Sequence, residues 1–205
     1  MVRDRLADDL YALSFSYGQK HARELQMASW QAARAGVSEH RVVDLRALGE
    51  VAEGGSALTD PRIPVPDLEH VPAEDRVQPP TYVPNRNMVL LAIAASWAET
   101  LGATRLFYGA QVQDRYGYWD CTVDFVARMN DVLSLNRREG VRIVAPLVDR
   151  TKAEIVSLGL SLGVDFARTW SCYQGGEMPC GSCPTCVERR AAFEAAGVRD
   201  PLTRA

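Results

Sequence analysis

Four cysteines near the carboxyl end of the chain constrain its fold more than any other feature. They follow the spacing Cys172-x7-Cys180-x2-Cys183-x2-Cys186, so four of the five cysteines lie within fifteen positions. A glycine and a proline between the closely spaced cysteines favour the turns that gather four ligands around one ion. The spacing therefore predicts a metal site, with four free thiols as the alternative.

Zinc is the expected metal, at one Zn²⁺ per chain. An iron–sulfur cluster is the competing interpretation, but the ferredoxin motif continues with a fourth cysteine followed by proline, which this sequence lacks. No histidine lies near the cysteines, and four sulfurs complete a tetrahedron, so the site is expected to be closed and structural. Beyond it, Thr185 and Glu188 are predicted to form a capping box for a helix that ends at Gly197. The fifth cysteine, Cys121, is interpreted as a small core residue rather than a nucleophile.

Composition excludes several classes of partner. The formal net charge of −3 and the pI near 5.7 provide no basic field for duplex nucleic acid. No apolar run is long enough to span a bilayer, and the charged residues after Met1 do not resemble a secretory signal. We therefore expect a cytoplasmic protein without direct nucleic-acid or membrane partners, in which cysteines serve metal or thiol chemistry rather than disulfides.

Strand-like and helix-like segments alternate along the chain. This order predicts an α/β fold with a parallel sheet and helices on both of its faces. Ligands of such sheets bind at the carboxyl ends of the strands, so the loops after Ser16, Gly109 and Leu147 are expected at the site. Strands are predicted at residues 11–16, 41–45, 105–110 and 141–147, and helices at 21–35, 87–101, 122–136 and from 151 onward.

Two further segments bear on the site. Thr151 and Glu154 fit a capping box that starts a helix. Lys152 in its first turn is either a solvated lysine or a positive charge at an anion site beside free helix N–H groups. Residues 54–84, rich in Gly, Pro, Asp and Ser, are expected to form a functional or mobile loop.

The residues around the cysteines resemble a known signature. Residues 169–176 are Thr-Trp-Ser-Cys-Tyr-Gln-Gly-Gly, and residues 187–190 are Val-Glu-Arg-Arg. Together with the cysteines, they resemble the C-terminal signature of the 7-cyano-7-deazaguanine synthase family. The resemblance extends over nearly the whole chain through segments 16–21, 55–59, 83–87 and 109–121.

This resemblance implies a fold and a reaction. The fold would be a Rossmann-like parallel sheet of the adenine nucleotide alpha hydrolase (PP-loop ATPase) type over residues 1–168, with a zinc-binding extension over residues 169–205. The enzyme would use ATP, with Mg²⁺, to activate the carboxylate of 7-carboxy-7-deazaguanine. Ammonia would give an amide, and a second activation would dehydrate it to the nitrile used in queuosine synthesis for transfer RNA. Family relatives are commonly dimeric, so a homodimer is an expected assembly.

The family's site residues carry over by position. By resemblance, the four cysteines are the zinc ligands and the loop around Gly117 and Cys121 touches the base. A carboxylate suits the N–H edge of a guanine-like base. The candidates for binding ATP are Ser16, Tyr17, Gly18, Gln19, Arg86 and Lys152, and those for binding the substrate are Asn87, Asp114, Tyr118 and Asp120.

The chain departs from the family pattern at three places. Family members open with a strand and a Ser-Gly-Gly-x-Asp-Ser loop that holds the ATP phosphates, and neither is present here. We expect a start codon assigned too late, with roughly 20 residues missing; a chain truly lacking them would lose a central strand as well as ATP binding. Trp119 and Thr122 stand where the family usually has proline and arginine.

These departures leave alternatives open. A related ligase could act on another deazapurine or acyl substrate, or a non-catalytic zinc-containing paralogue could keep the same shape. A transfer-RNA-modifying enzyme of the same ATP-binding superfamily is a third alternative, which the acidic balance disfavours. The ligase is the favoured hypothesis.

Overall fold

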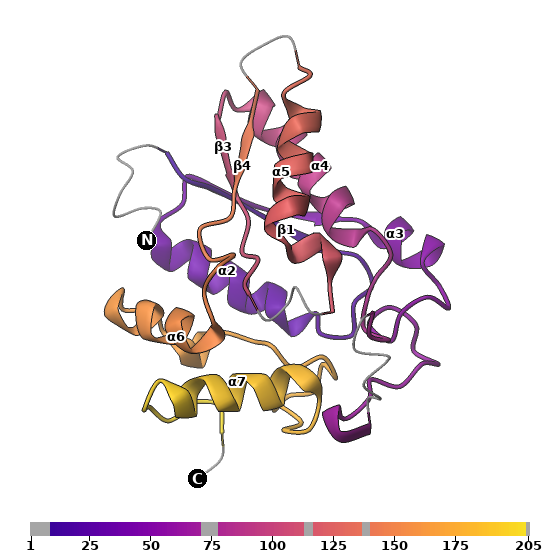
Figure 1. Ribbon diagram of the computed structural model, residues 1–205, viewed down its shortest axis with the longest axis vertical. Helices are drawn as coiled ribbons and strands as arrows, with labels where there is room; N and C mark the ends of the chain where they lie inside the picture. Colours follow the sequence, from indigo (N-terminus) through magenta and orange to yellow (C-terminus); the bar gives the residue numbers. More distant parts are fainter. Residues whose placement is uncertain (1–8, 71–77, 113–116, 137–139, 204–205) are drawn as a thin grey trace.

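The computed structural model has an α/β architecture built on parallel strands (Figure 1). It describes residues 9–70, 78–112, 117–136 and 140–203. The strands are β1 (Tyr11–Ser16), β2 (Glu39–Asp44), β3 (Arg105–Phe107) and β4 (Arg142–Val144). The helices are α2 (Arg23–Ala35), α3 (Arg46–Val51), α4 (Arg86–Thr100), α5 (Val123–Leu133), α6 (Lys152–Ser161) and α7 (Pro184–Ala195), with short 3-10 helices at Leu68–His70, Trp119–Cys121 and Phe166–Arg168.

The first strand pair forms a β–α–β unit. β1 pairs with β2 in parallel, from Tyr11 opposite Glu39 to Ser16 opposite Asp44, and α2 packs against both strands. The helix ends where Gly36 takes a left-handed conformation at φ 59°, which glycine adopts without steric cost. The predicted boundaries of this unit are confirmed to within two residues.

The second strand pair, β3 with β4, is also parallel and is covered by α4 and α5. Leu91, Phe125 and Ile143 form its buried core. Asn130 of α5 fixes the helix to the pair, because its amide bonds both the N–H and the C=O of Ile143. Both strands are shorter than predicted: beyond β4 the Val148 N–H donates to the Ala145 carbonyl, which turns the chain at a point where Pro146 has no donor for a ladder.

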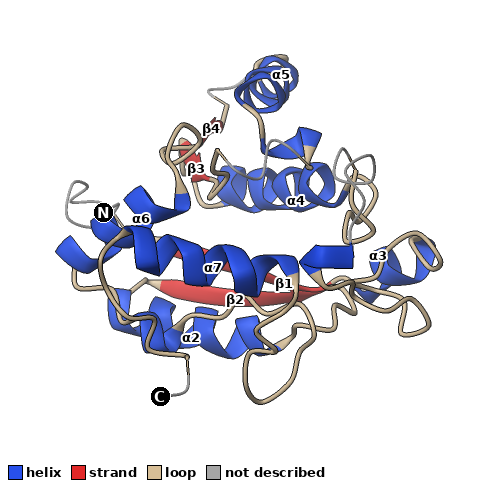
Figure 2. Cartoon of the chain, turned by 60° about the horizontal axis from the view of Figure 1, so that its bottom comes forward, coloured by secondary structure: helices blue, strands red, loops and turns tan. Residues whose placement is uncertain are grey.

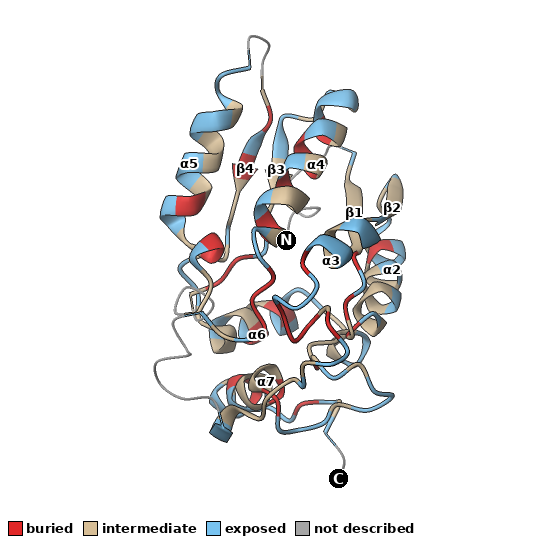
Figure 3. Cartoon of the chain, turned by 90° about the vertical axis from the view of Figure 1, so that its right-hand side faces the viewer, coloured by how far each residue is buried: buried red, intermediate tan, exposed pale blue. Residues whose placement is uncertain are grey.

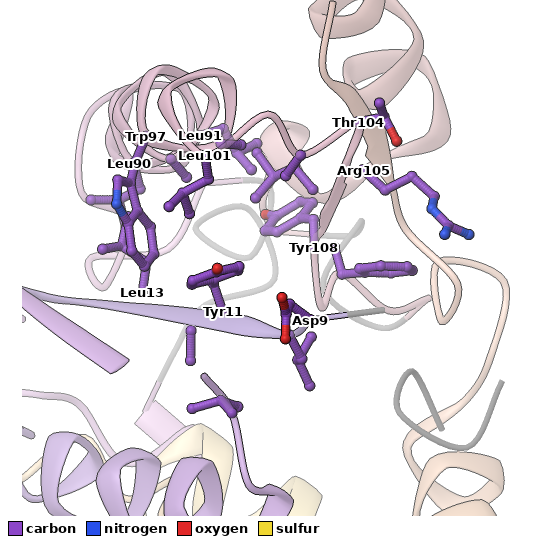
Figure 4. Close-up of a pocket in the computed structure, with 18 of the residues that line it drawn as sticks. Asp9, Tyr11, Leu13, Leu90, Leu91, Trp97, Leu101, Thr104, Arg105 and Tyr108 are labelled. Carbon is purple, nitrogen blue, oxygen red and sulfur yellow. The ribbon is translucent and has the colours of Figure 1, made fainter. Parts of the chain in front are cut away.

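The prediction of one continuous sheet is wrong for the described residues. Their strands form two separate two-stranded sheets, β1–β2 and β3–β4. A groove of about 700 Å³ separates β1 from β3. Figure 4 shows Tyr11 and Leu13 on one side of it, Leu90, Leu91 and Trp97 of α4 above, and Tyr108 on the other side. β1 and β3 form no hydrogen-bonded ladder with each other across the groove.

α6 and α7 pack against each other (Figure 2). Val156, Phe166 and Phe193 are the core of this contact. The capping box predicted at Thr151 is confirmed, since Thr151 accepts from the Glu154 N–H and Glu154 accepts from the Thr151 N–H. The second predicted capping box is wrong.

α7 begins at Pro184, with Cys183 as the residue before its first turn. Thr185 therefore lies inside the helix, where its hydroxyl donates to the Ser171 carbonyl. Proline is favoured at the first helical position because the missing N–H would have no partner there, and this signal sets the start two residues earlier than the capping pattern suggested.

The segment after α3 contributes to the core rather than only connecting elements. Leu58 and Val83 are almost fully buried and pack with Tyr17. Figure 3 shows buried stretches running through loops in the middle of the molecule. The described part of the predicted loop, residues 54–84, therefore packs against the turn that follows β1. Among the described residues, no helix is both long and apolar enough to cross a lipid bilayer.

Candidate functional site

The four clustered cysteines meet at one point. One sulfur atom from each of Cys172, Cys180, Cys183 and Cys186 lies within 4.8 Å of the others. Cys172 comes from the loop after Phe166–Arg168, Cys180 and Cys183 come from the turn that leads into α7, and Cys186 lies in the first turn of α7. Cys180 is exposed and the other three are buried.

The geometry fits a tetrahedral zinc ion. Zn–S bonds of about 2.3 Å place the sulfurs of a tetrahedron about 3.8 Å apart, and the Cys180 and Cys186 sulfurs are 3.9 Å apart. The backbone N–H groups of Cys180 and Cys183 donate to the Cys172 and Cys180 sulfurs, which stabilises negative charge on them. Hydrogen bonds from Cys172 and Cys186 lower the pKa of the Cys183 thiol. The hydrogen bonds among these three thiols raise the pKa of Cys172 and of Cys186.

The segment from Cys172 to Cys183, here called the cysteine loop, is fixed to the turn that follows β1, residues 17–21. Tyr173 packs against both the cysteine cluster and the core around Tyr17. Gly175 lies so close to the Lys20 carbonyl that a Cβ on it would stand 1.9 Å from the oxygen. A metal that restricts the motion of this loop would therefore also restrict the motion of residues 17–21.

That turn borders a second cavity, of about 360 Å³. It lies at the carboxyl end of β1, where the sequence predicted ligands to bind. Polar groups from several elements converge there, whereas the larger groove between β1 and β3 is lined mostly by apolar side chains. Convergent polar groups mark the smaller cavity as the candidate ligand pocket. Its lining residues are Ser14, Phe15, Tyr17, His21, Glu24, Leu25, Ala28, Arg86, Asn87 and Leu90.

Arg86 provides a positive charge in this pocket. Its Nη1 donates to the Tyr17 hydroxyl at 3.0 Å and its Nε donates to the Asn87 amide oxygen at 3.2 Å. Burial alone would lower the pKa of Arg86, but Tyr17, Tyr173 and Asp120 together raise it above its usual value, so the guanidinium stays charged. Within the described residues, no carboxylate forms an ion pair with it.

The chain places Arg86 and Asn87 by an unusual backbone turn. Asn85 precedes α4 with φ 54°, a left-handed conformation that asparagine tolerates better than most residues. The Asn85 N–H donates to the Tyr82 hydroxyl, which also accepts from Trp119. Trp119 thus supports the start of α4. Thr122, the other departure from the family pattern, caps α5 by accepting from the Phe125 N–H.

A buried polar cluster adjoins Asn87. Its amide donates to the Cys121 sulfur, and the Tyr108 hydroxyl contacts the same sulfur and donates to the Asp120 carbonyl. Burial raises the pKa of the Asp120 carboxyl above its usual range, and the charge of Arg86 offsets part of this effect. Burial likewise raises the pKa of the Tyr108 hydroxyl. Cys121 is buried with these partners, as expected for a core thiol.

The structure brings together some of the predicted site residues. Tyr17, Arg86 and Asn87 line one pocket, and Asp120 is electrostatically coupled to Arg86. Ser16 and Gly18 flank Tyr17 at the end of β1. Gln19 is buried, and its amide braces the turn by accepting from the Tyr17 N–H and donating to the Phe15 carbonyl.

Other predicted residues lie elsewhere. Lys152 forms an ion pair with Glu188 of α7 and does not line the pocket. Tyr118 shares a hydrogen bond with Thr81 at 2.7 Å. Asp114 lies outside the described residues. The roles of all three stay predictions.

Sequence reasoning missed two pocket residues, His21 and Glu24. The His21 Nε2 lies 3.3 Å from a Glu24 carboxylate oxygen, and both residues line the pocket. Their spacing of three residues at the start of a predicted helix was the available signal, because residues three apart share a helix face.

Comparison with known proteins gives consistent results. The family model described as "Queuosine biosynthesis protein QueC" matches residues 1–197. A 7-cyano-7-deazaguanine synthase of Chromohalobacter salexigens is 46% identical, over 98% of this chain and 78% of the relative. Those of Trichodesmium erythraeum and Caldicellulosiruptor bescii are each 44% identical over 95% of this chain, and over 88% and 85% of their own lengths.

Proposed function

The chain belongs to the 7-cyano-7-deazaguanine synthase family, and we propose that it activates the carboxylate of 7-carboxy-7-deazaguanine in the pocket at the carboxyl end of β1. The family's activity is an ATP-dependent ligation in queuosine biosynthesis, and we assign it to this chain. The nucleotide-binding part spans residues 1–168, with a fold of the adenine nucleotide alpha hydrolase type.

The proposed chemistry follows from the poor reactivity of a carboxylate. Transfer of a phosphate-containing group from ATP, bound with Mg²⁺, makes one carboxylate oxygen a leaving group. Ammonia then forms an amide, and a second activation removes the remaining oxygen to give the nitrile. The residues of the pocket would act mainly by positioning the reactants and stabilising negative charge.

Arg86 is the observation that carries this proposal. Its half-buried guanidinium has hydrogen bonds to a tyrosine hydroxyl and an asparagine amide, both neutral, so its charge is available to an anion. A carboxylate or a phosphate oxygen is a strong partner for such a group. The buried Asp120 next to it supports recognition of a base with N–H donors, together with Asn87 and the predicted contacts of Tyr118 and Asp114.

The cysteine cluster supports a structural zinc site. Cys172, Cys180, Cys183 and Cys186 would hold one Zn²⁺ with no ligand position left open, so the ion would brace the loop rather than bind substrate. We assign this element to residues 169–205. The homodimer, the cytoplasmic location and the absence of a direct nucleic-acid partner stay predictions.

A reconstituted reaction tests the proposal. The purified protein is incubated with 7-carboxy-7-deazaguanine, ATP, Mg²⁺ and ammonium, and the products are identified by mass spectrometry. We expect the nitrile only when all components are present, with ATP consumption that depends on the carboxylated base. Guanine in its place is the control and should not stimulate ATP consumption. If neither nitrile nor carboxylate-dependent ATP consumption is found, the proposal is wrong.

A further inference from the structure

The residue before α4 has a strained backbone conformation. Among the described residues, Asn85 is the one residue other than glycine with a positive φ, at 54°. It directly precedes Arg86 and Asn87, and its side chain makes no capping hydrogen bond to the helix. Left-handed residues of this kind persist only where their surroundings hold them, and they gather at functional sites. The contacts that hold Asn85 therefore bear on where Arg86 lies.

One tyrosine hydroxyl bonds to this turn and to a second element. The Tyr82 hydroxyl accepts from the Asn85 N–H at 3.1 Å and from the Trp119 Nε1–H at 2.9 Å. Tyr82 is buried, and the Trp119 ring packs edge-on against Phe125 of α5, at 5.4 Å between ring centroids. The hydroxyl thus joins the start of α4 to the 3-10 helix Trp119–Cys121.

The first turn of α4 determines where the Arg86 guanidinium faces. Two of its N–H groups already donate to the Tyr17 hydroxyl and the Asn87 amide oxygen, so its remaining N–H groups would bind an anion. Displacing a positioning group by about 1 Å can lower a rate by about a hundredfold. We propose that the Tyr82 hydroxyl and the Trp119 indole N–H are positioning groups for Arg86, an inference that rests on the proposed function. They hold Asn85 in its left-handed conformation and so direct the guanidinium toward the substrate anion.

A purely structural role is the alternative to a positioning role. Removing the Tyr82 hydroxyl leaves two N–H donors without this acceptor, and a lost acceptor lowers stability whether or not the donors serve catalysis. Loss of stability alone therefore does not separate the two roles. They differ in whether the loss of activity depends on Arg86.

A double-mutant cycle measures this dependence. Tyr82→Phe removes the hydroxyl and keeps the ring in the core. We expect it to lower kcat/KM for 7-carboxy-7-deazaguanine by about three- to tenfold, the usual effect of one hydrogen bond. In an Arg86→Gln background the same change should lower kcat/KM by less than about 1.5-fold, because no guanidinium is left to misdirect.

Trp119→Phe repeats the cycle at a residue that is 46% exposed, so the variant should fold even if Tyr82→Phe does not. It removes the indole N–H and keeps an aromatic ring against Phe125. We expect a smaller loss that Arg86→Gln likewise abolishes. Tyr11→Phe and Trp30→Phe are the matched controls, because neither residue lines the pocket, and both should keep the wild-type kcat/KM. Zinc content and the thermal midpoint report folding of each sample.

A glycine substitution tests the step through Asn85. Glycine adopts a positive φ without steric cost, and the exposed Asn85 N–H can donate to water once the hydroxyl is gone. Asn85→Gly should therefore restore most of the kcat/KM that Tyr82→Phe loses. Without such recovery, the hydroxyl does not act by holding this turn, and the inference is wrong.

Two further results would overturn the inference. One is an unchanged kcat/KM in folded Tyr82→Phe and Trp119→Phe, and the other is an equal loss with and without Arg86. If the wild-type protein forms no nitrile and consumes no ATP with the carboxylated base, the proposed function fails first and the inference fails with it. An active wild-type protein whose losses are independent of Arg86 contradicts the inference alone.

Discussion

The Arg86 guanidinium donates hydrogen bonds to the Tyr17 hydroxyl and the Asn87 amide oxygen at the N-terminal end of α4. These neutral partners orient the group without neutralising its charge. The geometry suits binding of an oxyanion by the remaining N–H donors.

We predict that Arg86→Gln lowers kcat/KM for the carboxylated substrate by roughly ten- to a hundredfold, because a hydrogen bond to a charged group contributes about 1.5–3 kcal/mol. Steady-state kinetics measures the effect. Arg128→Gln, at an exposed arginine of α5 paired with Asp124, is the matched control. Equal kinetics for the two variants would show that Arg86 does not bind the substrate anion.

The buried Asp120 carboxyl predicts a pH-dependent stability. Its pKa is raised by burial, so as pH rises above the ordinary carboxyl value of about 3.9 the unfolded chain releases its proton first. Stability is therefore lost until the pH passes the folded-state pKa. Asp120→Asn cannot ionise, and we expect it to gain stability relative to the wild type as the pH rises above the ordinary carboxyl pKa of about 3.9.

Urea midpoints measured across this pH range test the prediction. Asp124→Asn, on the exposed face of α5, should keep the wild-type slope. Parallel curves for Asp120→Asn and the wild type would contradict the assigned burial effect.

At the residue scale, the sequence predicts chemistry best where spacing alone defines it. The four cysteines were identified because metal ligands close in sequence leave a regular pattern. Arg86 and Asn87 were identified by resemblance. The His21–Glu24 pair was missed because a histidine and a glutamate three residues apart are common on helices, and only packing shows that one ring nitrogen is buried without a partner.

At the scale of elements, the cysteine loop and the turn after β1 act as one unit. Gly175 has φ 71° and meets the Lys20 carbonyl, whereas Gly163 has nearly the same φ, 70°, with no atom within 4 Å of a built Cβ. Comparing the two alanine substitutions separates backbone strain from close contact.

We predict that Gly163→Ala costs about 1–2 kcal/mol of unfolding free energy from its left-handed backbone, and that Gly175→Ala costs clearly more. Gly175→Ala should also weaken substrate binding, since the loop can no longer lie against residues 17–21. Chemical denaturation and substrate titration provide the measurements. Equal costs for the two variants would mean that the loop does not need its close contact.

Element types follow from periodicity and capping signals, but element ends depend on tertiary contacts. The signal at Thr151 is local and was read correctly. The pattern at Thr185 was equally good locally, yet Pro184 and the cysteine turn set the start of α7. Strand lengths at β3 and β4 were overestimated because apolar residues continue beyond the bonded ladder.

At the scale of the whole molecule, the cysteine element and the ligand pocket share a boundary. Tyr173 and Val65 belong to both hydrophobic clusters, and the Trp170 ring donates to the Cys172 carbonyl. A metal held by the cysteines would therefore stabilise the pocket as well as its own loop.

We predict that the purified protein contains one zinc ion per chain and that its removal by a chelator shifts the Trp170 fluorescence. Removal should also lower the thermal midpoint by well over 2–4 °C, the shift that about 1 kcal/mol gives a chain of this size. Cys121→Ser, which leaves the cluster intact, should retain the metal. Metal content below half an ion per chain, or an unchanged midpoint after removal, would contradict the assignment.

The described strands form two pairs, whereas the alternation of elements predicts a single sheet. Alternation predicts parallel strands, which is confirmed, but it does not determine which strands are neighbours. Neighbours depend on which edges meet, and β1 and β3 stand on opposite sides of the apolar groove. The candidate pocket lies at the carboxyl end of β1, one of the three strand ends where the sequence predicts ligands to bind.

Transfer of oxygen from the substrate tests the central claim most directly. The carboxylate of 7-carboxy-7-deazaguanine is labelled with ¹⁸O at both oxygens, and the products are analysed by mass spectrometry. If ATP activates the carboxylate, the nitrile contains no label and both labelled oxygens appear in phosphate-containing products of ATP. Label released into water, with none in those products, would contradict activation by ATP and with it the proposed function.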